Sequence, residues 1–285
     1  MARYGGQAVF EGVMMRGDGR SAVAVRRPDG GIEVRLDDLP TWGRRFERVP
    51  VARGVAALAE ALPLGFRALT WSAEHGLGQV RTRAPRWWER VFTLLVVAVV
   101  IVVGSVAPAV AATWVASSVF GLSVLAPVVE TVLGVLGLYV YLRLVGRLGD
   151  VVRLFENHGA EHKVVNAFEA GAPLTVESVQ RYSTRHVRCG TSFLLVVAVV
   201  SAAFFAAVGG STSPVLRVLA LPLIAGVAAE IQLRLAESRS RVLTLPGLAL
   251  QRFTTREPSD AQVEVAIAAL VAVLPRHEAA VPAAA

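Results

Sequence analysis

VFTLLVVAVVIVVGSVAPAVAATWVASSVFGLSVLAPVV, residues 91–129, contains no charged residue. A transmembrane helix needs about 20 consecutive apolar residues, so this run is long enough for one crossing and most of a second. It predicts a span near 91–113, a turn around SSVFGLS, and a second span near 123–145. The fold is therefore expected to be organised around a membrane.

The composition also favours a membrane protein over a soluble one. Hydrophobic residues make up 54% of the 285 positions and charged residues only 18%. A second uncharged run, 191–216, predicts a third span near 191–208, and a fourth follows the GGSTSP turn, near 214–233. The expected fold class is a mainly α membrane protein with about four transmembrane helices. Its cytoplasmic part is expected to hold a small N-terminal β-sheet and C-terminal helices.

Positive charge indicates the orientation of the spans. The net charge is +7; arginines precede the first predicted span, populate 143–188 and follow 233, whereas the two turns between paired spans have none. By the positive-inside rule, both termini face the cytoplasm. The lipid bilayer is thus the first expected partner. No aromatic and basic motif typical of nucleic-acid binding is found, so no nucleic-acid partner is expected.

The remaining segments have patterns of their own. PDGG at 28–31 lies between two alternating runs and predicts a hairpin within a sheet of about three strands. A helical pattern at 51–72, interrupted by Pro63, is typical of an amphipathic helix at the membrane interface. Near the C-terminus, Ser259 and Gln262 form a capping-box pattern before a packing helix. The expected organisation is a cytoplasmic sheet region (1–50), an interfacial helix (51–80), a first transmembrane pair (91–146), a cytoplasmic motif segment (147–190), a second transmembrane pair (191–233), cytoplasmic C-terminal helices (234–274) and a disordered tail (275–285).

The motif segment concentrates side chains that are rare elsewhere. ENHGAEHK, residues 156–163, holds two histidines, two acids and Lys163, the one lysine of the chain. His158, Glu161 and His162 have the spacing H-x-x-E-H. On a helix the two histidines lie one turn apart on the same face, where both can bind one divalent ion, most naturally zinc. Glu161 would then be placed to act as general base.

The H-x-x-E-H spacing has alternatives. It also suits two histidines on a hydrated helix near lipid headgroups, and Gly159 inside the motif disfavours a helix by about 1 kcal/mol. A metal would need a third protein ligand. The candidates are His186, Cys189, Glu169, Glu177 and Glu230.

A second cluster, YSTRHVRCGTS at 182–192, directly precedes the third predicted span. His186, Arg188 and Cys189 either complete a site with the histidines of the first motif, or form a positively charged membrane anchor with a small buried thiol. A Cys-His pair of Cys189 and His186 could also act as a nucleophile. Lys163 and Arg188 are candidates to stabilise a developing anion.

Three further residues are candidates for a shared site. In GGQAVFEGVMMRG, 5–17, the glycines suggest close backbone approach, Glu11 could reach the site and Arg16 could hold an anionic substrate. The alternative is a plain hairpin. Glu230 lies at the edge of the fourth predicted span, where an acid is either functional or paired with an arginine of a neighbouring helix.

Several blocks of the chain resemble the YqhQ family of bacterial membrane proteins. The matching stretches are GGQAVFEGVMMRG, HGAEHKVVNAFEAG, LTVESVQRYSTRHVRCGTSFL and LPGLALQRFTTREPSDAQVEVAIAAL, so the resemblance spans roughly 4–274. It implies a domain of unknown function in the bacterial cell membrane, with a predicted metal-dependent enzyme activity. Where the family often has an aromatic residue before the glutamate of the fourth span, this chain has Ala229.

Two functions fit these observations. One is a metal-dependent hydrolase whose site at the cytoplasmic membrane face acts on a membrane-associated substrate, such as a lipid-linked molecule or a membrane peptide. The other is a non-enzymatic scaffold or assembly factor whose cytoplasmic part binds a partner protein or lipid headgroups. A transporter would need more charged residues within the spans, or an oligomer.

Overall fold

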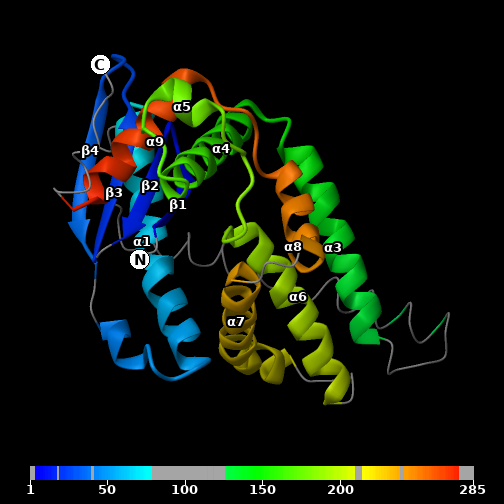
Figure 1. Ribbon diagram of the computed structural model, residues 1–285. Helices are drawn as coiled ribbons and strands as arrows, with labels where there is room; N and C mark the ends of the chain where they lie inside the picture. Colours follow the sequence, from blue (N-terminus) through cyan, green and yellow to red (C-terminus); the bar gives the residue numbers. More distant parts are fainter. Residues whose placement is uncertain are drawn as a thin grey trace, which may run out of the picture.

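The computed structural model describes residues 4–17, 19–39, 42–78, 114, 118, 126–208, 214–237 and 241–275. In this part of the chain, a sheet covered by helices lies beside a group of long apolar helices (Figure 1). The sheet is formed by the N-terminus, and its covering helices come from both halves of the chain. Sequence-distant segments therefore build one body.

The N-terminal sheet is an antiparallel meander with the strand order β1-β2-β3-β4. Its strands are β1 (Gly5–Val9), β2 (Gly12–Gly17), β3 (Arg20–Arg26) and β4 (Ile32–Asp38). The predicted PDGG hairpin is confirmed: it joins β3 to β4, with Gly30 at φ 88°. The sheet has one strand more than the three expected, because the glycine-rich run that forms β1 pairs with β2 across a two-residue turn.

Both faces of the sheet are covered, which explains why β2 and β3 are apolar at consecutive positions. Helices α4 (Gly149–Glu169) and α9 (Asp260–Val273) pack on one face, and α1 (Ala52–Gly76) packs on the other (Figure 1). Short helices η1 (Trp42–Phe46), α5 (Val176–Gln180), α8 (Arg241–Leu250) and η3 (Gln251–Phe253) connect these elements.

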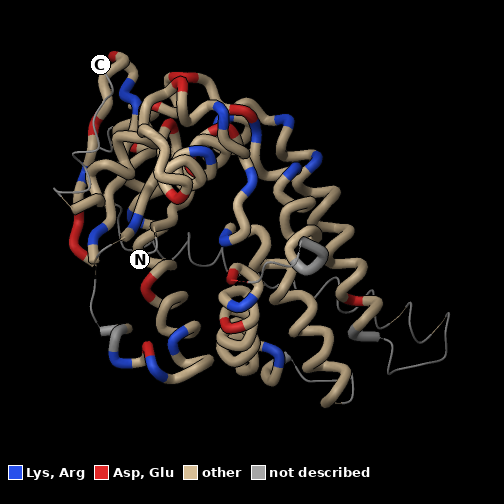
Figure 2. The backbone as a smooth tube through the Cα atoms, in the orientation of Figure 1, with Lys and Arg blue, Asp and Glu red and all other residues tan. Residues whose placement is uncertain are grey.

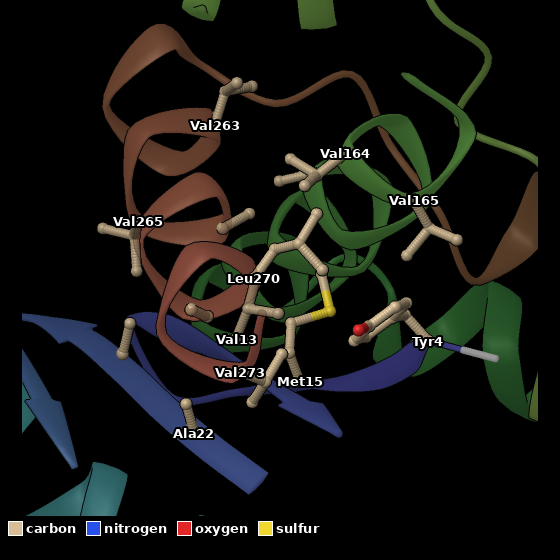
Figure 3. Close-up of a cluster of buried hydrophobic side chains, with 14 of the residues drawn as sticks. Tyr4, Val13, Met15, Ala22, Val164, Val165, Val263, Val265, Leu270 and Val273 are labelled. Carbon is tan, nitrogen blue, oxygen red and sulfur yellow. The ribbon is translucent and has the colours of Figure 1, made fainter. Parts of the chain in front are cut away.

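The larger core lies between the sheet and the pair α4 and α9. Figure 3 shows Val13 and Met15 of β2 close to Val164 of α4 and Leu270 of α9, all of them buried. Met14 points to the opposite face and belongs to a second cluster with α1, as the two-residue period of a strand requires. The sheet therefore fixes α4 and α1 relative to each other.

Three helices in the described part of the chain are long and apolar enough to cross a membrane. They are α3 (Ala126–Val145), α6 (Gly190–Ala207) and α7 (Pro214–Glu237), and α6 carries no charged residue (Figure 2). They correspond to the second, third and fourth predicted spans. The first predicted span, near 91–113, and residues 276–285 of the predicted tail lie outside the described residues.

The helix predicted at 51–72 is present but is not interrupted. It runs from Ala52 to Gly76 with Pro63 inside it. A proline inside a helix removes one hydrogen bond, so packing must hold the helix together. That packing includes a close crossing with α7, where a Cβ added to Gly54 would lie 2.7 Å from the Cβ of Ala229.

The C-terminal packing helix is confirmed as α9. Its capping box joins Ser259 and Gln262, as the sequence pattern predicted. Val263 and Leu270 on the apolar side of this helix are fully buried, and Leu274 is 3% exposed. This helix is thus the main cover of the sheet on the α4 side.

Leu270 provides a test of this core. Replacing it by alanine should lower the free energy of unfolding by about 2–5 kcal/mol, because the cavity lies between rigid elements. Its neighbour Val271 is 36% exposed and gives the matched control, Val271→Ala, which should cost far less. Thermal unfolding of the detergent-solubilised chain measures both, and equal losses would contradict the packing described.

Candidate metal centre

The two histidines of H-x-x-E-H lie one turn apart on α4, as the spacing predicts. Their ring centroids are 4.5 Å apart. Cys189 approaches from the start of α6, and its Sγ lies 3.3 Å from Nε2 of His158. One ligand atom from each of His158, His162 and Cys189 falls within 4.8 Å of the other two, so the three side chains converge on one point.

Backbone carbonyls fix the orientation of both imidazoles. Nδ1 of His158 donates to the carbonyl oxygen of Thr254 at 2.8 Å, and Nδ1 of His162 donates to that of Thr184 at 2.7 Å. A carbonyl can only accept, so the proton of each neutral ring is on Nδ1 and the lone pair is on Nε2. Histidine ligands of metals commonly have such an outer hydrogen bond. Both rings therefore present the atom that a metal would need.

Gly159 explains how Thr254 reaches the site. A Cβ added to Gly159 would lie 1.9 Å from the carbonyl oxygen of Arg256, so this backbone runs directly over α4. The N–H of Arg256 also donates to the carbonyl oxygen of Phe155 at 3.0 Å. The glycine that weakened the helix prediction is thus required by a close backbone crossing.

Gln251 holds the loop that carries Cys189. This side chain is fully buried; its Oε1 accepts from the N–H of His186 at 2.9 Å, and its Nε2 donates to the carbonyl oxygen of His186 at 2.8 Å and to Oγ of Ser192 at 2.9 Å. Sequence reasoning missed Gln251. The one indication in the sequence was that Gln251 lies in LPGLALQRFTTREPSDAQVEVAIAAL, a stretch that resembles the family. Neither its spacing from the histidines nor its charge connects it with them.

Glu161 lies beside the converging donors. It is 5% exposed; its Oε2 is 3.4 Å from Nε2 of His162, and its Oε1 accepts from the N–H of Gly6 at 2.9 Å. A Cβ added to Gly6 would lie 3.1 Å from Cγ of Glu161. The glycines near the N-terminus therefore permit a close approach of β1 to the acid, as the sequence suggested.

His186 uses both ring nitrogens elsewhere. Its Nε2 donates to Glu169 at 3.2 Å, and its Nδ1 accepts from the N–H of Arg188 at 3.3 Å. Burial lowers the pKa of His186, and the charge of Glu161 opposes this to a smaller extent. The neutral ring lies 6.0 Å from that of His162, outside the converging group. The close cysteine–histidine pair is consequently Cys189 with His158, not with His186.

Comparison with known proteins places the chain in a family. A model described as a protein of unknown function (DUF1385) matches residues 49–276. The chain belongs to this family. A curated relative, the uncharacterized protein YqhQ of Bacillus subtilis (strain 168), is 33% identical over 289 residues, which cover 93% of this chain and 90% of the relative. No solved structure matches. The predicted YqhQ resemblance is confirmed, whereas the metal-dependent activity stays a prediction.

The other candidate residues of this DUF1385 chain lie in ion pairs. Lys163 is 4% exposed; its Nζ donates to the carbonyl oxygen of Gln180 at 2.8 Å and lies 2.8 Å from Glu257. Arg188 pairs with Glu169. These contacts do not test the anion-stabilising roles of the two cations, which stay a prediction.

The candidate site residues near the N-terminus and in α7 are also separate from the histidines. Glu11 pairs with Arg153 at 2.7 Å, and Arg16 is exposed on β2. Glu230 is 7% exposed and binds Arg53 of α1 at 2.5 Å. The alternative stated for Glu230, an arginine partner from a neighbouring helix, is the arrangement found. Glu177, the other distant candidate ligand, pairs with Arg181.

Gly159 gives a test of the backbone crossing. Gly159→Ala should displace residues 254–256, remove the Thr254 hydrogen bond from His158 and lower the melting temperature. Gly149, at the start of the same helix, has nothing within 4 Å of an added Cβ, so Gly149→Ala is the matched control and should be neutral or stabilising. Thermal unfolding in detergent compares them; a Gly159→Ala chain as stable as the control would contradict the crossing.

Proposed function

We propose that this chain is a multi-pass protein of the bacterial cell membrane that binds a divalent metal, zinc, through His158, His162 and Cys189 and hydrolyses a membrane-associated substrate. The observation that carries the proposal is the convergence of three donor atoms within 4.8 Å, with both imidazole Nδ1 atoms committed to carbonyls.

The donor set suits zinc. Zinc binds imidazole nitrogen at about 2.0–2.1 Å and thiolate sulfur at about 2.3 Å, and catalytic sites commonly have three protein ligands and one open position. The separation of 3.3 Å between Sγ of Cys189 and Nε2 of His158 is one that a single ion can bridge. Cys189 is also the N-cap of α6, where the helix dipole favours a negative ligand.

Glu161 is the group best placed to move a proton. When bound, zinc supplies Lewis-acid activation of water and of the bond to be broken. The N–H of Gly6 holds Oε1 of Glu161, which leaves Oε2, on the side of His162, to accept a proton from an attacking water. Oε2 can then return this proton to the leaving group.

The position of Cys189 supports a substrate at the membrane. The candidate span α6 begins at the next residue, Gly190, so the donors lie at the end of a span. The arginines around this end suit the cytoplasmic side. A substrate that reaches the donors from the bilayer would be a lipid-linked molecule or a membrane peptide.

Metal content is the direct test. Detergent-purified wild-type chain should contain about one zinc per chain, and His158→Ala and Cys189→Ser should lose most of it, because each removes one of three ligands. His75 stacks on Trp71 in α1 and lies outside the converging group, so His75→Ala is the matched control and should keep its metal. Elemental analysis measures all four. Equal, near-zero metal in every sample would refute the proposal and leave the non-enzymatic scaffold.

The role of Glu161 needs a second test. Glu161→Gln should retain zinc but lose about 10²–10⁴-fold in hydrolysis, the usual contribution of a general base. Chromogenic esters, phosphoesters and quenched peptides, offered to the chain in nanodiscs, measure the rate. Glu156 is bound by Gln262 on another side of α4, so Glu156→Gln is the control and should retain activity. Full activity of Glu161→Gln would exclude this residue as the base.

A further inference from the structure

Helix α1 exposes large apolar side chains on one side. Leu62 is 71% exposed and Phe66 is 65% exposed, one helical turn apart. Ala59 and Pro63 are exposed on the same side, as the spacing of three and four residues requires. We call Ala59, Leu62, Pro63 and Phe66 the α1 stripe. The opposite side of the helix, which includes Gly65, is buried against the sheet.

Exposed cations flank the α1 stripe. Arg67, next to Phe66, has a side chain that is 62% exposed. Before the helix, Arg45 and Arg48 are exposed together with Phe46 and Val49, which are 40% and 51% exposed. Apolar side chains mixed with arginines are typical of helices that lie at the surface of an anionic bilayer.

The stripe is held beside a candidate span. Glu230 of α7 binds Nε and Nη2 of Arg53 at 2.6 and 2.5 Å and accepts from the N–H of Val51 at 3.2 Å. A Cβ added to Gly226 of α7 would lie 2.6 Å from Val51, so the two helices touch along their backbones. In Figure 1, α1 extends from the sheet to the side of α7. Because α1 packs directly on α7, the medium that surrounds α7 also contacts α1.

We propose that the α1 stripe is embedded in the headgroup and upper acyl region of an anionic lipid bilayer, with the flanking arginines at the level of the phosphates. This proposal rests on the membrane location given above and is independent of the metal. A bilayer fits better than a protein partner, because α1 packs against the candidate span α7, and because the exposed arginines at 45, 48 and 67 outnumber Glu47, the one exposed acid described between 45 and 67.

The contact between α1 and the bilayer would also fix the distance of the candidate metal centre from the lipid headgroups. Helix α1 binds β1 and the turn that follows it: Nε2 of Gln7 in β1 donates to the carbonyl oxygen of Gly65 at 3.3 Å, and the N–H of Phe10 in the turn donates to Oγ of Ser72 at 3.1 Å. The same strand holds Glu161 through Gly6. A helix seated in the bilayer thus positions β1, and with it Glu161, relative to a membrane-bound substrate.

Fluorescence quenching tests the embedding. Cysteine is introduced by Leu62→Cys, Phe66→Cys, Val132→Cys or Leu36→Cys, labelled with an environment-sensitive dye and placed in nanodiscs with anionic and brominated lipids. Val132 of α3 is 60% exposed and reports the span; Leu36 of β4 is 47% exposed and reports the sheet. The wild-type chain, whose single cysteine is buried, gives the labelling background.

Dyes at 62 and 66 should lose most of their emission to brominated lipid, as the dye at 132 does, while the dye at 36 should lose little. Quenching at 132 with none at 62 and 66 overturns the embedding and leaves the membrane location intact. No quenching at any position overturns both. Protection of 62 and 66 together with spin-label proximity between chains would assign the stripe to a second copy, and would also overturn the proposal.

Discussion

The close crossing of two backbones at Gly159 is the constraint on which the candidate centre depends. Residues 254–256 pass over α4 at a distance that leaves no room for a side chain. This crossing brings the Thr254 carbonyl to His158, and it places Gln251, a few residues earlier, where it can hold the loop before α6. One C-terminal segment thereby orients a histidine of α4 and positions the loop that carries Cys189.

The sheet supports the same centre from the other side. Strand β1 supplies the Gly6 N–H that holds Glu161, and α1 fixes the far side of this strand. Because both faces of the sheet are covered, neither α4 nor α1 can shift without disturbing a buried cluster. The acid and the imidazoles are thus fixed by separate parts of the chain, which suits a site that must keep its geometry.

Local patterns predicted the elements well and the contacts of charged residues poorly. The hairpin, the capping box at Ser259 and the one-turn spacing of His158 and His162 each depend on neighbours within a few residues, so the sequence displays them directly. Lys163 shows the opposite case. It is adjacent to the motif, yet on a helix adjacent residues point about 100° apart, and its charge is directed to Glu257.

The sequence by itself determined the apolar helices, the N-terminal sheet, the family and the two-histidine face of α4. Hydrophobic runs and the spacing of residues along a helix or strand depend only on neighbouring positions in the chain. It left five candidates for a third ligand, and it gave no reason for Gly159 or Gln251. Only the tertiary structure placed Cys189, rather than His186, beside the two histidines, because this depends on how a buried amide holds a loop 31 residues from His158. Contacts between distant segments follow from how the whole protein packs, and the spacing of residues along one segment does not predict them.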